Sequence, residues 1–520
     1  MAQAHISQDA TGAHPPRSLP AMLTRIVFVL LALLPFFLGT LAAIDHFLDY
    51  GRYKTISLLT PLFLFSMLFI ALRNCSCRVS EPVLLIGLFA AAVLVRASSQ
   101  GFFNTQPISD YMDAVNAART FMQGPARSLE TARFPYWGFY RITLATLFRI
   151  FGGSIDTIKT FNLLLSGLTA VAIYQLGRQM IPSRRFAVLA ALVFIIDPAN
   201  LLYINMPTGE HIFVLLFPLA MLLMLAVFGQ PDRKNAIRFS LAALLGVLVG
   251  LMDIYKPIGP VILIAILITL TLTQWSICKA MQEKQRRRKH ILLVVLLLAV
   301  VLGSYLITKE VCFSIIAYYA QIPPNRYGVG WTLRVGLNIE TRGRVSSDLA
   351  YYMHSLYAES NENYPAVNEQ LIDEALAGLE GKTLATLFQF IRNKFAFTWQ
   401  SNQDFYNWAS NTQIASGVNA YDTERLALLA YPLIDGFLIL RLMLSALGAG
   451  YCAVKRKDMV TLVVGLFILG FSLLLLIVEV QQRYRSVLAS AIPFFAAYAL
   501  YAFQDAAGRV TAWIRNEESS

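Results

Sequence analysis

Charged residues are scarce in this chain of 520 residues: 14% are Asp, Glu, Lys or Arg, whereas 57% are hydrophobic. An average soluble domain carries about 25% charged residues. Mean hydropathy is +0.56, and the apolar runs are continuous, without the alternation of β-barrel strands. We therefore expect an all-α polytopic membrane protein with one sizeable loop inserted between its spans.

Cysteine and histidine are also sparse, with five and six residues. Cys75 and Cys77 form a CxC that no second pair or histidine cluster accompanies. The histidines are scattered and show no HExxH spacing. These spacings disfavour a zinc site, and we expect neither a metal nor another cofactor.

Acidic residues are fewer than basic ones, 31 against 43, which gives a formal net charge of +12. No basic stripe is interleaved with exposed aromatic residues, so nucleic acid is not an expected partner. Internal repeats are not apparent either. The excess of Lys and Arg is better explained by loops that fix orientation and contact anionic lipid headgroups.

Twelve apolar segments are candidate membrane spans. They cover residues 22–44, 55–72, 82–97, 157–178, 186–203, 209–228, 237–253, 257–278, 290–308, 428–453, 459–479 and 485–504. A thirteenth stretch, 136–151, contains Arg141 and Arg149, and charges within lipid are costly. We therefore expect it to be a helix lying at the outer interface.

Basic residues fall in alternate connections of this twelve-span arrangement. They are Arg17 and Arg25, Arg73 and Arg78, Arg178, Arg184 and Arg185, Arg233, Lys234 and Arg238, residues 284–289, Lys455 to Lys457, and Arg509 and Arg515. The positive-inside rule makes that side the cytoplasm. Both termini are then cytoplasmic, and the protein is expected in the cell membrane.

This topology divides the chain into five parts. They are a cytoplasmic tail at 1–21, a transmembrane core at 22–308 that includes a loop at 98–156, a large extracytoplasmic loop at 309–427, C-terminal spans at 428–504 and a cytoplasmic tail at 505–520. In the large loop, segments 367–380 and 384–398 have helical apolar spacing and are expected to rest on the membrane surface.

An acidic pair lies in the first extracytoplasmic loop. Ser109 or Asp110 is placed to cap a helix that runs to Gln123, where Gly124 and Pro125 stop it. One interpretation is simply a capped surface helix. The other is a catalytic base, Asp110, kept ionised by the amides at the helix start. Asp113 either binds substrate or only caps the helix.

Cations on the same side favour the catalytic interpretation. Arg133, Lys256, Arg483 and Arg485 all fall at outer ends, as does Glu210. Snorkelling to headgroups explains some of them, but their convergence would suit an anionic lipid headgroup. One base and several cations fit sugar transfer from a polyprenyl-phosphate donor to a hydroxyl acceptor, because the cations stabilise the leaving phosphate.

The order of several short motifs resembles the C-type superfamily of membrane glycosyltransferases, in the bacterial branch similar to protein O-mannosyltransferases and aminoarabinose transferases, which is glycosyltransferase family 39-like. The matching segments are residues 108–111, 133–137 with Tyr136, 147–153, 176–178, Glu210, 250–257 with Lys256, and Arg483-Tyr484-Arg485. The resemblance implies that Asp110 is the base and that a hexose such as mannose is transferred. Two spans precede the family's usual first span, and Lys256 stands where Arg is common.

A transporter or flippase of lipid-linked sugars is the main alternative. It would show inverted repeats and helices broken at mid-membrane, whereas the charges of this chain gather at outer ends. A non-enzymatic scaffold is a third reading, but it would not need Asp110 and the cations together.

Overall fold

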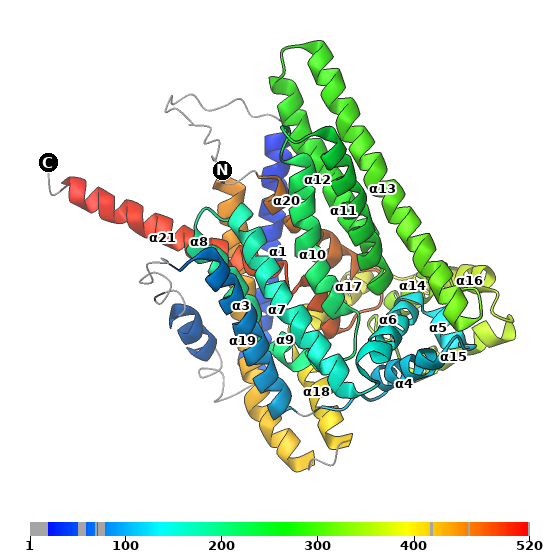
Figure 1. Ribbon diagram of the computed structural model, residues 1–520. Helices are drawn as coiled ribbons and strands as arrows, with labels where there is room; N and C mark the ends of the chain where they lie inside the picture. Colours follow the sequence, from blue (N-terminus) through cyan, green and yellow to red (C-terminus); the bar gives the residue numbers. More distant parts are fainter. Residues whose placement is uncertain are drawn as a thin grey trace.

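The computed structural model describes residues 19–49, 59–67, 70, 79–103, 105–415, 420–455 and 458–517. Residues 1–18 of the first predicted tail, eight of the eighteen residues of the second predicted span, and Cys75 and Cys77 lie outside these residues. Within them, every regular element is a helix (Figure 1).

The long helices form the body of the molecule. They are α1 (Leu19–Asp49), α3 (Glu81–Phe102), α7 (Ile155–Met180), α10 (Glu210–Phe228), α11 (Asn235–Tyr255), α12 (Gly259–Ala280), α13 (Lys284–Ala320), α19 (Ala420–Lys455), α20 (Met459–Leu474) and α21 (Ile492–Glu517). Helix α11 packs against α10 and α13, and α19 packs against α1 and α21. Their facing sides bury one large apolar core.

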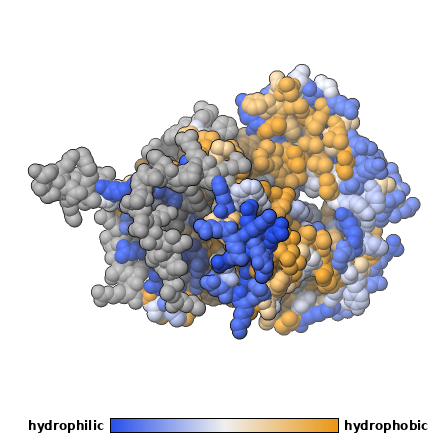
Figure 2. Space-filling model, turned by 90° about the horizontal axis from the view of Figure 1, so that it is seen from above, coloured by the Kyte–Doolittle hydropathy of each residue, from blue (hydrophilic) through white to orange (hydrophobic). Residues whose placement is uncertain are grey.

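Seven helices of the described residues are long and apolar enough to cross a membrane: α3, α7, α10, α11, α12, α13 and the part of α19 from Ala430. Viewed from above, hydrophobic side chains cover a wide area on one side of the molecule, at the upper right of Figure 2. A polytopic α-helical membrane protein is confirmed at this level, whereas the count of twelve spans stays a prediction.

Two predicted spans are broken helices. The segment 186–203 divides into α8 (Arg184–Ile195) and α9 (Pro198–Tyr203). The break has a local cause, because Pro198 lacks an amide hydrogen and the Asp197 carboxylate accepts from the Ala199 amide at 3.2 Å. The last span starts as a 3₁₀ helix, η2 (Gln482–Leu488), which bends by 67° into α21.

Helix α13 corrects a predicted boundary. The span expected at 290–308 continues to Ala320, so the second large connection begins about a dozen residues later than predicted. The 37 residues of α13 correspond to about 55 Å at 1.5 Å per residue. The exposed basic residues 284–289 lie at its start, the upper end in Figure 1.

Short helices fill both large connections. The first holds α4 (Asp110–Gln123), α5 (Leu129–Arg133) and α6 (Pro135–Phe151), and the second holds α14 (Val329–Gly336), α15 (Ser347–Glu359), α16 (Tyr364–Ala377), α17 (Leu384–Trp399) and α18 (Gln403–Ala415). Helices α4–α6 and α14–α16 lie together at the lower right in Figure 1.

The predicted helices in these connections are present. Helix α4 runs from Asp110 to Gln123 and stops at Gly124, as its sequence predicts. Segments 367–380 and 384–398 correspond to α16 and α17. Helix α6 is too short to count among the candidate spans, and it packs against α4, α5, α11 and α13.

Candidate active site

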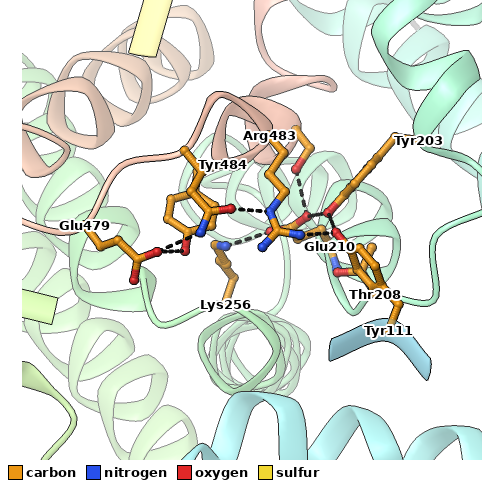
Figure 3. Close-up of polar contacts among 10 residues, drawn as sticks. Tyr111, Tyr203, Thr208, Glu210, Lys256, Glu479, Arg483 and Tyr484 are labelled. Carbon is orange, nitrogen blue, oxygen red and sulfur yellow. Dashed lines mark hydrogen bonds and ion pairs between the residues drawn. The ribbon is translucent and has the colours of Figure 1, made fainter. Parts of the chain in front are cut away.

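Glu210 is the centre of a buried polar cluster. It is the first residue of α10 and is 5% exposed. One carboxylate oxygen accepts from the Lys256 ammonium at 2.6 Å, and the other accepts from the Tyr203 hydroxyl at 2.7 Å and the Ser486 hydroxyl at 3.1 Å (Figure 3). Four separate elements therefore meet at one carboxylate, which compensates for its burial.

Arg483 enters the cluster from η2. Its guanidinium donates to the Tyr111 hydroxyl and, through Nε, to Gln481 Oε1 at 2.5 Å (Figure 3). It also stacks over the Trp408 ring, 4.6 Å from the centroid. Arg483 forms no direct ion pair with a described residue, so no carboxylate in contact with it neutralises its charge.

A hydroxyl chain connects Arg483 to Glu210. The Tyr111 hydroxyl lies 3.0 Å from the Tyr203 hydroxyl, which in turn donates to Glu210. Burial raises the pKa of Tyr111 to about 12, so this hydroxyl keeps its proton at neutral pH. The chain links α4, α9, α10 and η2 in one hydrogen-bonded network.

Lys256 directly follows α11 and lies beneath Tyr484 in Figure 3. Its ammonium is 4.0 Å from the centroid of the Tyr484 ring, and the Tyr484 hydroxyl donates to Glu479 at 2.8 Å. An ammonium has three donors, and the hydrogen bond to Glu210 uses one. The side chain is 15% exposed, so Lys256 and Arg483 together present two cations to a ligand.

Asp110 lies at the exposed edge of this cluster. It directly precedes Tyr111, and its only hydrogen bond within the described residues comes from the Ser109 hydroxyl at 3.4 Å. The expected cap is absent, because Ser109 has a φ of 50° and no amide at the start of α4 donates to the Asp110 carboxylate. The carboxylate therefore remains open to a substrate.

Tyr136 is a half-buried residue in the first turn of α6. Burial raises its pKa first, and the neighbouring charges of Glu479 and Asp110 raise it further, whereas Arg483 opposes them. The Tyr136 hydroxyl is therefore within electrostatic range of both the exposed Asp110 carboxylate and the buried Arg483 guanidinium. Asp113 is exposed on the next turn of α4, and partial desolvation raises its pKa.

Arg133 lies outside the cluster. It forms an ion pair with Glu362, also contacts His354 Nδ1 at 3.2 Å, and lies over the Tyr357 ring. Its role in the structure is to join the two large connections. Burial lowers the pKa of His354, so this imidazole is neutral at pH 7.

Arg485 is not brought into the cluster either. Its guanidinium donates to the Ser401 carbonyl and to Asn402 Oδ1, and it stacks over the Trp399 ring. Arg485 therefore holds the end of α17 against η2. The spacing of Arg483 and Arg485 in the sequence gives no sign that the two side chains have different partners.

Several members of the cluster were not among the predicted site residues, among them Tyr111, Tyr203, Glu479 and Ser486. Tyr111 had a signal in the sequence, because it follows the predicted base, and Glu479 opens the turn that carries Arg483. Tyr203 had none. No group of three or more His, Cys, Asp or Glu side chains in the described part of the chain is arranged to hold a metal ion.

No protein-family model and no curated relative matches this chain. Solved structures similar to this chain include ArnT from Cupriavidus metallidurans bound to undecaprenyl phosphate, at 14% identity and a TM-score of 0.35, and the same protein in the apo state, at 13% identity and a TM-score of 0.30. Each match covers 81% of this chain and 78% of the other. Because both TM-scores are low, the proposed function rests on the residues of the cluster.

Proposed function

We propose that this protein is a membrane glycosyltransferase that moves a sugar from a polyprenyl-phosphate donor to a hydroxyl acceptor. The observation that carries the proposal is the hydrogen-bonded network around Glu210, which contains Lys256 and Arg483 and reaches Tyr111, the residue next to the exposed carboxylate of Asp110. These cations come from distant parts of the chain, and both have donors to spare for a phosphate.

In this reaction the donor phosphate binds Lys256 and Arg483, and Tyr484 helps to fix the ammonium. Asp110 takes the proton of the acceptor hydroxyl as that oxygen attacks the anomeric carbon. The bond from this carbon to the phosphate oxygen breaks, and the two cations stabilise the charge left on the polyprenyl phosphate. A single displacement of this kind inverts the anomeric configuration and needs no metal.

The proposal also covers the membrane side, the sugar, the acceptor and the remaining site residues. The reaction takes place on the outer face of the cell membrane, with both termini cytoplasmic. A hexose such as mannose is the proposed sugar, and a protein, a glycan or a lipid is the acceptor. Asp113 and Tyr136 line the acceptor side, whereas Arg133 and Arg485 support the site from outside it.

Asp110→Asn tests the base directly. We expect at least a hundredfold loss of transfer, because general-base catalysis contributes about 10²–10⁴-fold. Purified protein is given a radiolabelled polyprenyl-phosphate sugar in detergent, and release of polyprenyl phosphate is measured. Asp156→Asn, at an exposed carboxylate in the first turn of α7, is the matched control and should retain most activity. Full activity of Asp110→Asn would refute the base assignment.

A transporter of lipid-linked sugars remains the second candidate. Two observations favour it: the helix break at Asp197, whose carboxylate forms a buried ion pair with Arg441, and the bend between η2 and α21. Release of polyprenyl phosphate by protein in detergent, with no membrane gradient, supports the enzyme. Binding of the donor without turnover would favour the transporter.

A further inference from the structure

Three arginines surround an open pocket that shares no lining residue with the candidate active site. Arg342 and Arg344 precede α15, and Arg392 lies on α17. The pocket has a volume of about 430 Å³, and the amides of Asn393 and Gln400 also line it. All three arginines are exposed, so their guanidinium groups are accessible to a ligand.

The positive charge of this pocket is not neutralised. None of the three arginines forms an ion pair with a described residue, although Glu340 is only two residues from Arg342. Arg344 stacks over the Phe397 ring at 4.8 Å and donates to the Thr341 carbonyl, which is neutral. Guanidinium groups with free forks bind phosphate in a bidentate manner.

The loop that carries two of the arginines is held in place. Between them, Gly343 accepts from the Val480 amide and donates to the Asn338 carbonyl, both at 2.9 Å. Gly343 has a φ of +75°, and a Cβ there would lie 2.7 Å from Lys394 Cε. The backbone around the pocket is therefore fixed by α17 and by the segment after α20.

An exposed apolar face adjoins the pocket. Leu384, Phe388 and Ile391 are 86%, 71% and 41% exposed on α17, at positions i, i+4 and i+7. Arg392 lies one turn after Phe388 on the same face. At the other end of α17, Trp399 is buried in the main core with the membrane helices. This arrangement of apolar side chains beside cations is typical of a helix that contacts lipid chains and headgroups.

We propose that Arg342, Arg344 and Arg392 form a binding site for the phosphate of an anionic lipid, whose chains lie along the exposed face of α17. The site is separate from Lys256 and Arg483, and it does not rest on the function proposed for them. A zwitterionic lipid is disfavoured because its own cation would meet the three guanidinium groups.

Native mass spectrometry of the full-length protein in a non-ionic detergent tests this site. The protein is titrated with phosphatidylglycerol, with phosphatidylcholine of the same chains, and with inorganic phosphate. We expect wild-type protein to bind phosphatidylglycerol at least tenfold more tightly than phosphatidylcholine. The triple variant Arg342→Gln, Arg344→Gln, Arg392→Gln should lose this preference.

Arg127→Gln is the matched control, because Arg127 is an exposed arginine outside the pocket, and it should bind like the wild type. The single variant Arg392→Glu should weaken binding with an unchanged melting temperature, which separates lost binding from misfolding. The proposal is overturned by equal binding of phosphatidylglycerol to wild-type and triple-variant protein. It is also overturned if inorganic phosphate binds while the two lipids bind equally.

Discussion

At the scale of single residues, Glu210 and Lys256 form an ion pair whose carboxylate is almost completely buried. Glu210→Gln leaves the Lys256 ammonium without its counter-charge in a poorly hydrated place. Breaking one side of a buried pair costs about 3–5 kcal/mol. We therefore expect a clear fall in the melting temperature, measured by intrinsic fluorescence in detergent.

The exposed pair Glu310–Arg326 is the matched comparison for Glu210. Its side chains are 57% and 48% exposed, and an exposed pair contributes about 1 kcal/mol or less. Glu310→Gln should leave the melting temperature almost unchanged. Equal effects of the two substitutions would mean that Glu210 is hydrated or paired differently in the folded protein.

Lys394 is expected to make the folding stability of the protein depend on pH. Its ammonium donates to the carbonyls of Gly336 and Leu476, and burial lowers its pKa to about 7 from an ordinary 10.5. Between these pKa values the unfolded chain binds more protons than the folded protein, so stability rises with pH. We expect the melting temperature to increase from pH 7 to pH 9.5.

Lys394→Met should flatten this increase, because methionine does not titrate. Lys382→Met is the control: Lys382 is exposed just before α17 and should leave the pH dependence as in the wild type. If wild-type protein and Lys394→Met respond identically to pH, the buried ammonium is not the source of the effect.

At the scale of elements, α11 and α13 pack closely at Gly246. A Cβ at this position would lie 2.2 Å from the Val301 carbonyl oxygen of α13. Gly246→Ala must therefore separate the two helices and should destabilise the protein by about 1–3 kcal/mol. Thermal denaturation in detergent measures this effect.

Gly303, on α13 itself, is the control for Gly246. Nothing lies within 4 Å of a Cβ built there, and alanine is about 1 kcal/mol better than glycine in a helix interior. Gly303→Ala should leave stability equal or raised. A destabilised Gly303→Ala together with a neutral Gly246→Ala would contradict the packing of these helices.

The sequence was sufficient to predict elements that local chemistry determines. Hydropathy places the long helices, and Gly124 ends α4 where predicted because it stops the helical pattern locally. The break at Asp197 was missed, although Pro198 signals it, because the apolar run continues through both residues. The contact between Tyr111 and Arg483 could not be predicted, because these residues are 372 positions apart in the sequence. Their contact depends on how α4 and η2 pack together in the folded protein.

At the scale of the whole molecule, the charge distribution predicts an orientation. The basic residues 284–289 begin α13, and its last turn lies with the first large connection, where the Ala126 amide donates to the Tyr319 carbonyl at 2.9 Å. The two ends of α13 are thus on opposite sides of the bundle. We expect a reporter fused at residue 285 to be cytoplasmic and one at residue 127 to be outside.

A pair of fusions is more informative than either alone, because each reports one side of the membrane. The side reported by residue 127 is the one on which we place both large connections, and with them Asp110 and the arginine pocket. Alkaline phosphatase and green fluorescent protein fusions read out the two sides independently. An external signal at residue 285 would invert the proposed topology and place the candidate site on the cytoplasmic face.

The length of α13 determines how far the first large connection lies from the membrane core. Its length of about 55 Å exceeds the roughly 30 Å hydrocarbon thickness of a bilayer, so part of this helix lies outside the hydrocarbon layer. The Ser128 amide donates to the Ala320 carbonyl in the last turn of α13. This hydrogen bond attaches the first large connection to the C-terminal end of the helix. Under the proposed function, an acceptor too bulky to enter the lipid headgroup layer approaches Asp110 from the aqueous side, while the donor arrives from the membrane plane.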